Sequence, residues 1–435
     1  MRCFRWITLT MVAAIVVATN SCTSHDLFDQ RVTQSISDSL SPVDSLDRNH
    51  NWLLTKTRSI TVEANANVNA QWLKILTDDP RLSEDAEVAT QVMITEGQKT
   101  YNMSFCFPSI VTTLYAALID DQGLYTVTAF SPEDRKVDFS EPLYTKQNIL
   151  YTPQPQTFVY CYEEEMPDFL KVDFDFNDII LNISYERTGE REIRFHVELA
   201  AVGTDRQVGA AIRLKNFKYD EIESVTTVGG ASFNVNTNNE EVPNQILVVH
   251  KDKTPLLMSN TENKEAVINL FCDAHWATGA MRAKEEDYGM MERKRYNVGR
   301  GTGYQTMVPR EVTYIVTFKE KTGLEYLNFD LIDPFIIKEY NGGIFEVHQF
   351  ANRNDWVLQE YKIAEIVKLP WALTIPYKKF RHTLEGVNIG FKKKEIMGFG
   401  AYSSVRGHTF GEWSMNSNLA QDWYLNEYAT DNQVY

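Results

Sequence analysis

The sequence predicts an all-β protein with two β-sandwich domains, of jelly-roll or immunoglobulin-like type, that follow a signal peptide and a flexible tether. Two observations predict this class. Apolar and polar residues alternate at period two in several stretches that end at turn-forming residues, which is typical of half-buried strands; examples are 112–120, 191–199 and 311–320. Apolar stripes at helical spacing are short, and the one at 72–88 is interrupted by Pro80. The chain is therefore expected to pack sheet against sheet.

Length and composition set the number of domains and exclude one class of partner. The chain has 435 residues, of which 43% are hydrophobic and 23% are charged. This composition fits a folded protein of two or three domains at roughly 150 residues each. The 59 acidic residues outnumber the 43 Lys and Arg residues, so the formal net charge is −16. Because a nucleic-acid-binding protein needs a basic face to displace counterions, nucleic acid is not expected as a partner.

Residues 1–21 are predicted to be a lipoprotein signal peptide. Two arginines precede an apolar run at 7–18, which suits the core of a signal peptide but falls short of the roughly 20 residues that span a bilayer. The run ends with a small residue directly before Cys22, which resembles a bacterial lipobox, although Thr19 stands where Leu is common. The resemblance implies that Cys22 is acylated and anchors the protein in the outer membrane, facing the periplasm or the cell surface. The alternative is an ordinary secretory signal with an incidental Cys22.

The remaining chain divides into a tether and two folded parts. Residues 22–60 are polar and rich in Ser and Asp, and they are expected to form a flexible tether between the lipid anchor and the body. Two prolines near residue 155 mark a change in composition, so an N-terminal β-sandwich is expected at 61–155 and a β-rich domain at 156–435. The later cysteines lack paired spacing and are expected to be buried thiols: Cys106, Cys161 and Cys272.

One stretch of the second domain is unusually acidic. Residues 163–178 contain seven carboxylates and only one basic residue, Lys171. Carboxylates at this density repel one another unless a cation lies among them, and Ca²⁺ takes six to eight oxygen ligands in flexible geometry. An extended chain would direct alternate residues of 173–177 to one side and the rings of Phe174 and Phe176 into the core. The run is not an EF-hand, because Asp178 stands where that loop needs Gly. The alternatives are a Ca²⁺ site and a solvated acidic loop.

Short motifs follow one another through the second domain. They are YEE at 162–164, DFDFND at 173–178, AAVGTDRQVGAAIRL at 200–214, FDLIDPFI at 329–336, LPWALTIP at 369–376 and DWY at 422–424. In this order they resemble the motifs of LruC-domain proteins, outer-membrane lipoproteins of Bacteroidetes and related bacteria whose C-terminal part is a domain of unknown function. The stretch IFEVHQF at 344–350 resembles a further element of the family, EIHLPG, although Ala351 and Asn352 replace its Gly/Pro ending. The resemblance covers residues 158–428.

The resemblance implies secretion, lipidation and a β-rich domain, and it brings no established activity. The acidic and amide residues at the matched positions are the expected cation site, with Ca²⁺ as the expected ion. These residues are Glu163, Glu164, Asp173, Asp175, Asn177 and Asp178.

Sequence motifs of the common enzyme classes do not appear. The chain has no HExxH pair, no GxSxG elbow and no GxxxxGK phosphate loop. The predicted role is therefore binding, adhesion or envelope structure, with a glycan or a protein as ligand and the membrane as partner through the anchor. The alternative is an enzyme that acts on polysaccharide, which would need two carboxylates about 5 to 10 Å apart in an open cleft.

Overall fold

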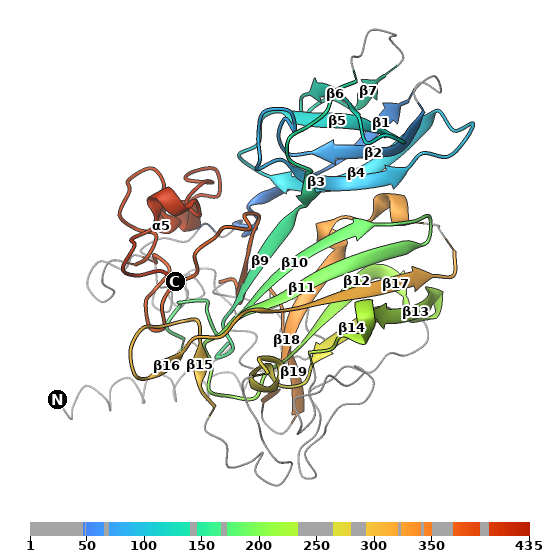
Figure 1. Ribbon diagram of the computed structural model, residues 1–435. Helices are drawn as coiled ribbons and strands as arrows, with labels where there is room; N and C mark the ends of the chain where they lie inside the picture. Colours follow the sequence, from blue (N-terminus) through green and yellow to red (C-terminus); the bar gives the residue numbers. More distant parts are fainter. Residues whose placement is uncertain are drawn as a thin grey trace, which may run out of the picture.

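The computed structural model describes residues 47, 49–64, 69–139, 146–166, 172–233, 264–279, 293–320, 323–340, 343–349, 369–391 and 400–435 (Figure 1). These ranges form mainly β-strands with a few short helices, so the predicted all-β class is confirmed. The predicted signal peptide, Cys22 and most of the predicted tether lie outside the described residues. No helix within these ranges combines the length and the apolar character needed to cross a lipid bilayer.

The N-terminal part of the chain forms two sheets that face each other, drawn in blue to cyan in Figure 1. The core between them contains Val62, Leu73, Phe105 and Leu118, all at most 1% exposed. The three-stranded sheet has the order β4 (Thr100–Pro108), β1 (Thr55–Glu63), β7 (Lys136–Asp138). The five-stranded sheet has the order β6 (Tyr125–Phe130), β5 (Leu114–Asp120), β2 (Ala70–Leu76), β3 (Glu87–Met93), β8 (Gln154–Pro155).

The C-terminal part forms a second, larger pair of sheets (Figure 1). One sheet has the order β13 (Ile222–Thr227), β17 (Arg310–Phe318), β11 (Glu192–Val202), β10 (Ile179–Arg187), β9 (Thr157–Tyr162), β20 (Ala372–Ile375). In addition, β15 (Arg295–Tyr296) pairs with β11, and β16 (Tyr304–Gln305) pairs with β15. The other has the order β14 (Glu265–Phe271), β12 (Gly209–Lys218), β18 (Ile332–Tyr340), β19 (Gly343–Val347). Within the described ranges, the helices are α3 (Ala274–Ala277), α5 (Phe410–Met415) and the 3-10 helices η1 (Tyr219–Glu221), η2 (Val228–Gly230), η4 (Leu324–Tyr326), η5 (Phe329–Leu331) and η7 (Asn426–Tyr428).

Two strands in the middle of the larger sheet, β10 and β11, bury the residues that their sequence patterns predict to be buried. In β11, buried and partly exposed side chains alternate from Glu192 to Ala200, as the sequence predicts, because one face lies on the core. Its neighbour β10 begins with the consecutive apolar residues Ile179, Ile180 and Leu181, and all three are buried. β10 pairs with β9 on one side and β11 on the other. The segment between β9 and β10 is therefore held at both ends by paired strands.

The chain passes from one pair of sheets to the other between Pro155 and Thr157. β8 pairs with β3 of the first sandwich, and β9, which begins at Thr157, pairs with β10 of the second. The predicted end of the tether at residue 60 falls inside β1, and Trp52 and Leu54 before that strand are each only 2% exposed. Trp52 is buried although the composition around it is polar, because burial of one Trp side chain removes a large apolar area from water.

Trp52 packs in the core of the second sandwich rather than the first. Its ring lies 5.4 Å from that of Trp413 and 6.4 Å from that of Phe410, measured between centroids. The neighbouring His50 accepts a hydrogen bond at Nδ1 from the Trp52 amide (2.9 Å), so its Nε2 carries the proton and donates to the Trp413 carbonyl (2.7 Å). The residues just before β1 thus attach the start of the described chain to the C-terminal part.

The three later cysteines are buried free thiols, as the sequence predicts. Burial raises the pKa of Cys106 and of Cys272 to about 12, and it also raises the pKa of Cys161. These thiols stay protonated near neutral pH and behave as small apolar side chains.

Candidate functional site

The acidic segment lies at the end of the paired strands β9 and β10 of the larger sheet. It leaves β9 at Tyr162 and enters β10 at Ile179. The Asp178 amide donates to the Tyr162 carbonyl (3.2 Å), and the Glu163 amide donates to the Trp371 carbonyl (3.1 Å). The two ends of the segment therefore meet, and their backbone hydrogen bonds extend the pairing of the sheet beyond the ends of β9 and β10. Asp168, one of the seven acids, lies outside the described residues.

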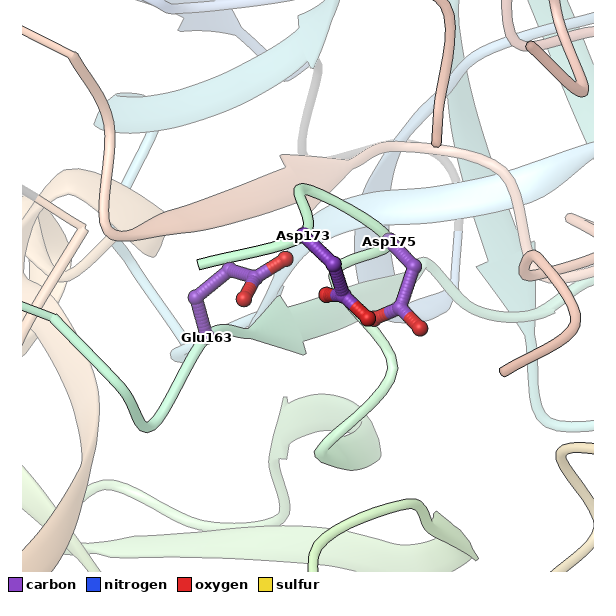
Figure 2. Close-up of side chains that lie close together, drawn as sticks. All are labelled: Glu163, Asp173 and Asp175. Atoms are coloured by element: carbon purple, nitrogen blue, oxygen red, sulfur yellow. The ribbon is translucent and has the colours of Figure 1, made fainter. Parts of the chain in front are cut away.

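Three carboxylates from the two ends of this segment lie together. Glu163, Asp173 and Asp175 each offer one oxygen, and these oxygens lie within 4.8 Å of one another. Figure 2 shows the three side chains, with the carboxylates of Asp173 and Asp175 in close approach and that of Glu163 beside them. Glu163 is 0% exposed and Asp175 is 3% exposed, whereas Asp173 is exposed. The group is buried on one side and open to solvent at Asp173.

Glu163 also belongs to a second group of carboxylates. Its oxygen lies within 4.8 Å of one oxygen from Glu165 and one from Asp178. The matched motif positions do not include Glu165, and the structure adds it to the cluster. Glu165 lies in a turn at 164–166, so strand alternation does not predict which side its carboxylate faces.

Backbone amides hold several of the carboxylate oxygens. Oε1 of Glu163 accepts from the Phe176 amide (2.7 Å), and Oδ2 of Asp178 accepts from the Glu164 amide (2.6 Å). Asp175 accepts from the Asn177 amide at Oδ1 (3.2 Å) and from the Gly386 amide at Oδ2 (2.7 Å). Oε2 of Glu163 differs from these atoms, since it is buried and has no hydrogen-bond partner among the described residues.

The backbone of the acidic segment is not extended, and this corrects the sequence-based expectation. Phe174 and Phe176 have φ values of +59° and +52°, in the left-handed region that bulky residues rarely adopt. Both rings are nevertheless buried, as expected. Such residues cost about 1–3 kcal/mol each and persist where surrounding structure fixes them. Here the Phe174 ring packs on Phe391 (5.2 Å between centroids), and the Phe174 carbonyl accepts from the Ile389 amide (2.8 Å).

Burial and mutual repulsion act on the carboxylates together. Burial is the largest cause that raises the pKa of Glu163 well above its usual range, and the charge of Asp175 adds to it. Burial likewise raises the pKa of Asp175, with Asp173 contributing, and that of Asp178, with Glu165 contributing. The ionised forms of these groups therefore need a nearby positive charge. Without one, the groups retain protons.

Glu164 has a different environment from Glu163. Its carboxylate is 3.2 Å from the Arg206 guanidinium and 3.8 Å from Nζ of Lys338, and it accepts from the Thr204 hydroxyl (3.2 Å). Glu164 begins the turn at 164–166, and its side chain faces this basic pair while Glu163 faces the acids. Glu164 belongs to neither group of converging carboxylates.

Asn177 and its surroundings show how tightly the segment is packed. Its Nδ2 donates to the Thr383 carbonyl (3.2 Å), and its buried Oδ1 has no hydrogen-bond partner within the described part of the chain. A Cβ added at Gly203 would lie 2.3 Å from Oδ1 of Asn177 and 2.6 Å from its carbonyl oxygen. Only glycine fits at this close approach.

Distant parts of the chain complete the site and were not predicted from the sequence. Gly386 supplies a hydrogen bond to Asp175, and Glu385 lies beside it. Burial raises the pKa of Glu385 to about 7, although its ion pair with Arg295 (3.1 Å) opposes the shift. These residues lie about 200 positions after Asp175 and carry no local motif, so only the folded chain brings them to the acidic segment.

Comparisons with known proteins give one family and one solved structure. No curated protein matches the sequence significantly. A crystal structure described as that of a candidate lipoprotein from Bacteroides ovatus aligns with a TM-score of 0.49 at 14% identity, covering 84% of this chain and 99% of the other. Residues 191–414 match the profile of a domain of unknown function, DUF4842, and directly follow the acidic segment and β10. Since this match spans more than half of the 435 residues, the chain belongs to the DUF4842 family.

Proposed function

We infer that the protein is a lipid-anchored protein of the outer membrane, with a role in binding, adhesion or envelope structure, and that its acidic segment binds Ca²⁺ as a structural ion. The observation that carries the ion site is the Glu163 side chain. It is 0% exposed, and its Oε2 has no hydrogen-bond partner in the described ranges, yet acidic oxygens surround it. A buried ionised carboxylate without a partner costs on the order of several kcal/mol. A bound cation removes this cost.

The donor set favours calcium among the common metal ions. Glu163, Asp173 and Asp175 provide only carboxylate oxygens, which suit hard cations, and neither group of converging ligands contains a His or Cys. The three oxygens lie within 4.8 Å of one another, which is close enough for one ion to contact all of them. Ca²⁺ accepts six to eight oxygen ligands in flexible geometry, whereas Mg²⁺ demands a nearly ideal octahedron, so carboxylates from separate ends of an irregular segment suit Ca²⁺ better.

The position of the group explains what the ion would stabilise. Glu163 follows β9, and Asp173 and Asp175 precede β10. Asp175 is also joined to the Gly386 amide, and the Asp173 carbonyl accepts from Nδ2 of Asn388 (3.3 Å). A cation at this point links the two ends of the acidic segment to the C-terminal part of the chain. Removal of the ion should therefore loosen both ends of the segment and the C-terminal part. The measurement that tests the ion site is thermal unfolding with and without a chelator.

A polysaccharide-acting enzyme fits the same residues less well. A glycoside hydrolase holds its two carboxyl groups about 5 to 10 Å apart on either side of an open cleft. Glu163 and Asp175 are almost fully buried, and their oxygens lie within 4.8 Å of each other. A sugar ring cannot enter between them, whereas a metal ion can.

Replacement of Cys22 tests the anchor. We expect Cys22→Ala to move the protein from the membrane fraction to the soluble fraction and to abolish labelling by a fatty-acid probe, because the acylated thiol is lost. Cys3→Ala is the matched control, since Cys3 lies in the predicted signal peptide and should not affect the anchor. Unchanged labelling of Cys22→Ala would show that the lipobox interpretation is wrong.

A further inference from the structure

We propose that the acidic segment binds two calcium ions side by side, the second held by Glu163, Glu165 and Asp178, with the Glu163 carboxylate bridging both. This inference rests on the proposed calcium site and extends it. The first observation is that Glu163 converges with two separate sets of acids, one with Asp173 and Asp175 and one with Glu165 and Asp178. In each set of three residues, one carboxylate oxygen from each residue lies within 4.8 Å of the other two, and only Glu163 is common to both sets.

The second observation is the state of the Glu163 carboxylate. Its Oε1 accepts one hydrogen bond from the Phe176 amide, while the buried Oε2 has none from the described residues. A carboxylate has about four lone-pair sites on its two oxygens, so Glu163 has free capacity for more than one ligand bond. A bridging carboxylate uses this capacity fully, and paired metal ions in proteins lie about 3.5–4 Å apart.

The balance of charge supports two divalent ions rather than one. The described part of the cluster contains six carboxylates: Glu163, Glu164, Glu165, Asp173, Asp175 and Asp178. Arg206 contacts Glu164 (3.2 Å) and Glu165 (3.6 Å), and Lys338 contacts Glu164 (3.8 Å). These two basic residues offset two negative charges. The four that remain match two Ca²⁺ ions, whereas one ion would leave two charges uncompensated in a largely buried site.

The second position, like the first, has access to solvent. Glu165 is 25% exposed at its side chain, and Asp178 is 9% exposed as a residue. Water molecules can therefore complete the coordination of an ion at this side, as Ca²⁺ commonly requires. Oδ2 of Asp178 already accepts from the Glu164 amide, which fixes the direction of this carboxylate toward the site.

The experiment is a calorimetric titration of Ca²⁺ into the chelated full-length protein, with the bound metal also counted by elemental analysis after dialysis. We expect two ions per chain in the native protein. Glu165→Gln and Asp178→Asn should each reduce the number to one, and Asp173→Asn should do the same through the other position. Glu163→Gln should lose both ions, because it removes the bridge. Far-ultraviolet circular dichroism checks that each variant is folded.

The possible results separate this inference from the calcium site itself. One ion in the native protein, with Glu165→Gln unchanged and Asp173→Asn unable to bind, would contradict the second ion and leave the single site intact. Two ions in both the native protein and Glu165→Gln would contradict the assignment of Glu165 as a ligand. Absence of any bound Ca²⁺ in the native protein would overturn both the single site and the pair.

Discussion

Chelation of calcium should lower the melting temperature of the protein. An ion that binds only the folded state stabilises it by RT ln(1 + [L]/Kd), which is about 2.7 kcal/mol at a hundredfold excess over Kd and about 4.1 kcal/mol at a thousandfold excess. For a domain of about 150–250 residues, each kcal/mol changes the melting temperature by roughly 2–4 °C. Melting in millimolar Ca²⁺ and in EDTA, followed by circular dichroism, measures this difference.

A pair of matched variants shows whether the effect arises at the acidic segment. Asp175→Asn keeps the size of the side chain but removes a buried charge from the group, so it should clearly reduce the difference in melting temperature between EDTA and Ca²⁺. Asp431→Asn is the control, because Asp431 is 91% exposed at its side chain and pairs only with Arg381 among the described residues. It should retain the full chelator effect. Equal melting of the native protein in EDTA and in Ca²⁺ would leave the cluster without an ion.

The effect of the chelator should increase with pH. In the ion-free folded protein, burial raises the pKa of Glu163, Asp175 and Asp178 well above the values near 4 that they have when unfolded. As pH rises above about 4, the unfolded chain releases protons that the folded chain retains, so the ion-free protein loses stability. Ca²⁺ binds the ionised carboxylates and removes this loss. The difference in melting temperature should therefore be larger at pH 8 than at pH 5.

Trp413→Ala should destabilise the protein by about 3–5 kcal/mol, the usual cost of removing a fully buried aromatic side chain. Trp413 is 0% exposed, and its ring contacts Trp52, Phe410 and Trp423 at centroid distances of 5.4, 5.6 and 5.8 Å. The cavity would open where the residues before β1 join the C-terminal core. Denaturant unfolding measures the loss of stability.

An exposed apolar residue provides the control for this substitution. Leu82 is 86% exposed, and Leu82→Ala should change the free energy of unfolding by no more than about 0.5 kcal/mol. A loss below 1 kcal/mol for Trp413→Ala would show that the contacts of Trp413 with Trp52 do not hold these segments together. Protease cleavage between residues 47 and 54 should become faster in Trp413→Ala and stay unchanged in Leu82→Ala.

The strands were predictable from the sequence where apolar and polar residues alternate, because this alternation indicates which side chains are buried. The alternation at 191–199 corresponds to β11, because each side chain there faces either the core or the opposite side of the sheet. The interrupted stripe at 72–88 corresponds to the end of β2 and the start of β3, joined by a turn that contains Pro80. Trp52 was assigned to the tether, because the polar composition of a long window hides one aromatic residue at its end.

The candidate site was predictable in its residue types and not in its geometry. The density of acids identified Glu163, Asp173 and Asp175, which the structure brings together. The left-handed backbone at Phe174 and Phe176 was not predictable, because it depends on Phe391 and Ile389, more than 200 residues later in the chain. The separation of Glu164 from the cluster was not predictable either, because Glu164 lies in a turn and its pairing with Lys338 is a long-range contact.

Anomalous X-ray diffraction from crystals grown in Ca²⁺ shows directly whether Glu163, Asp173 and Asp175 hold a calcium ion. We expect an anomalous difference peak about 2.3–2.6 Å from a carboxylate oxygen of each of the three residues, with no such peak in crystals of Asp175→Asn. Well-ordered carboxyl groups that bond to one another with no peak between them would contradict it, since protons rather than a metal ion would then neutralise the cluster.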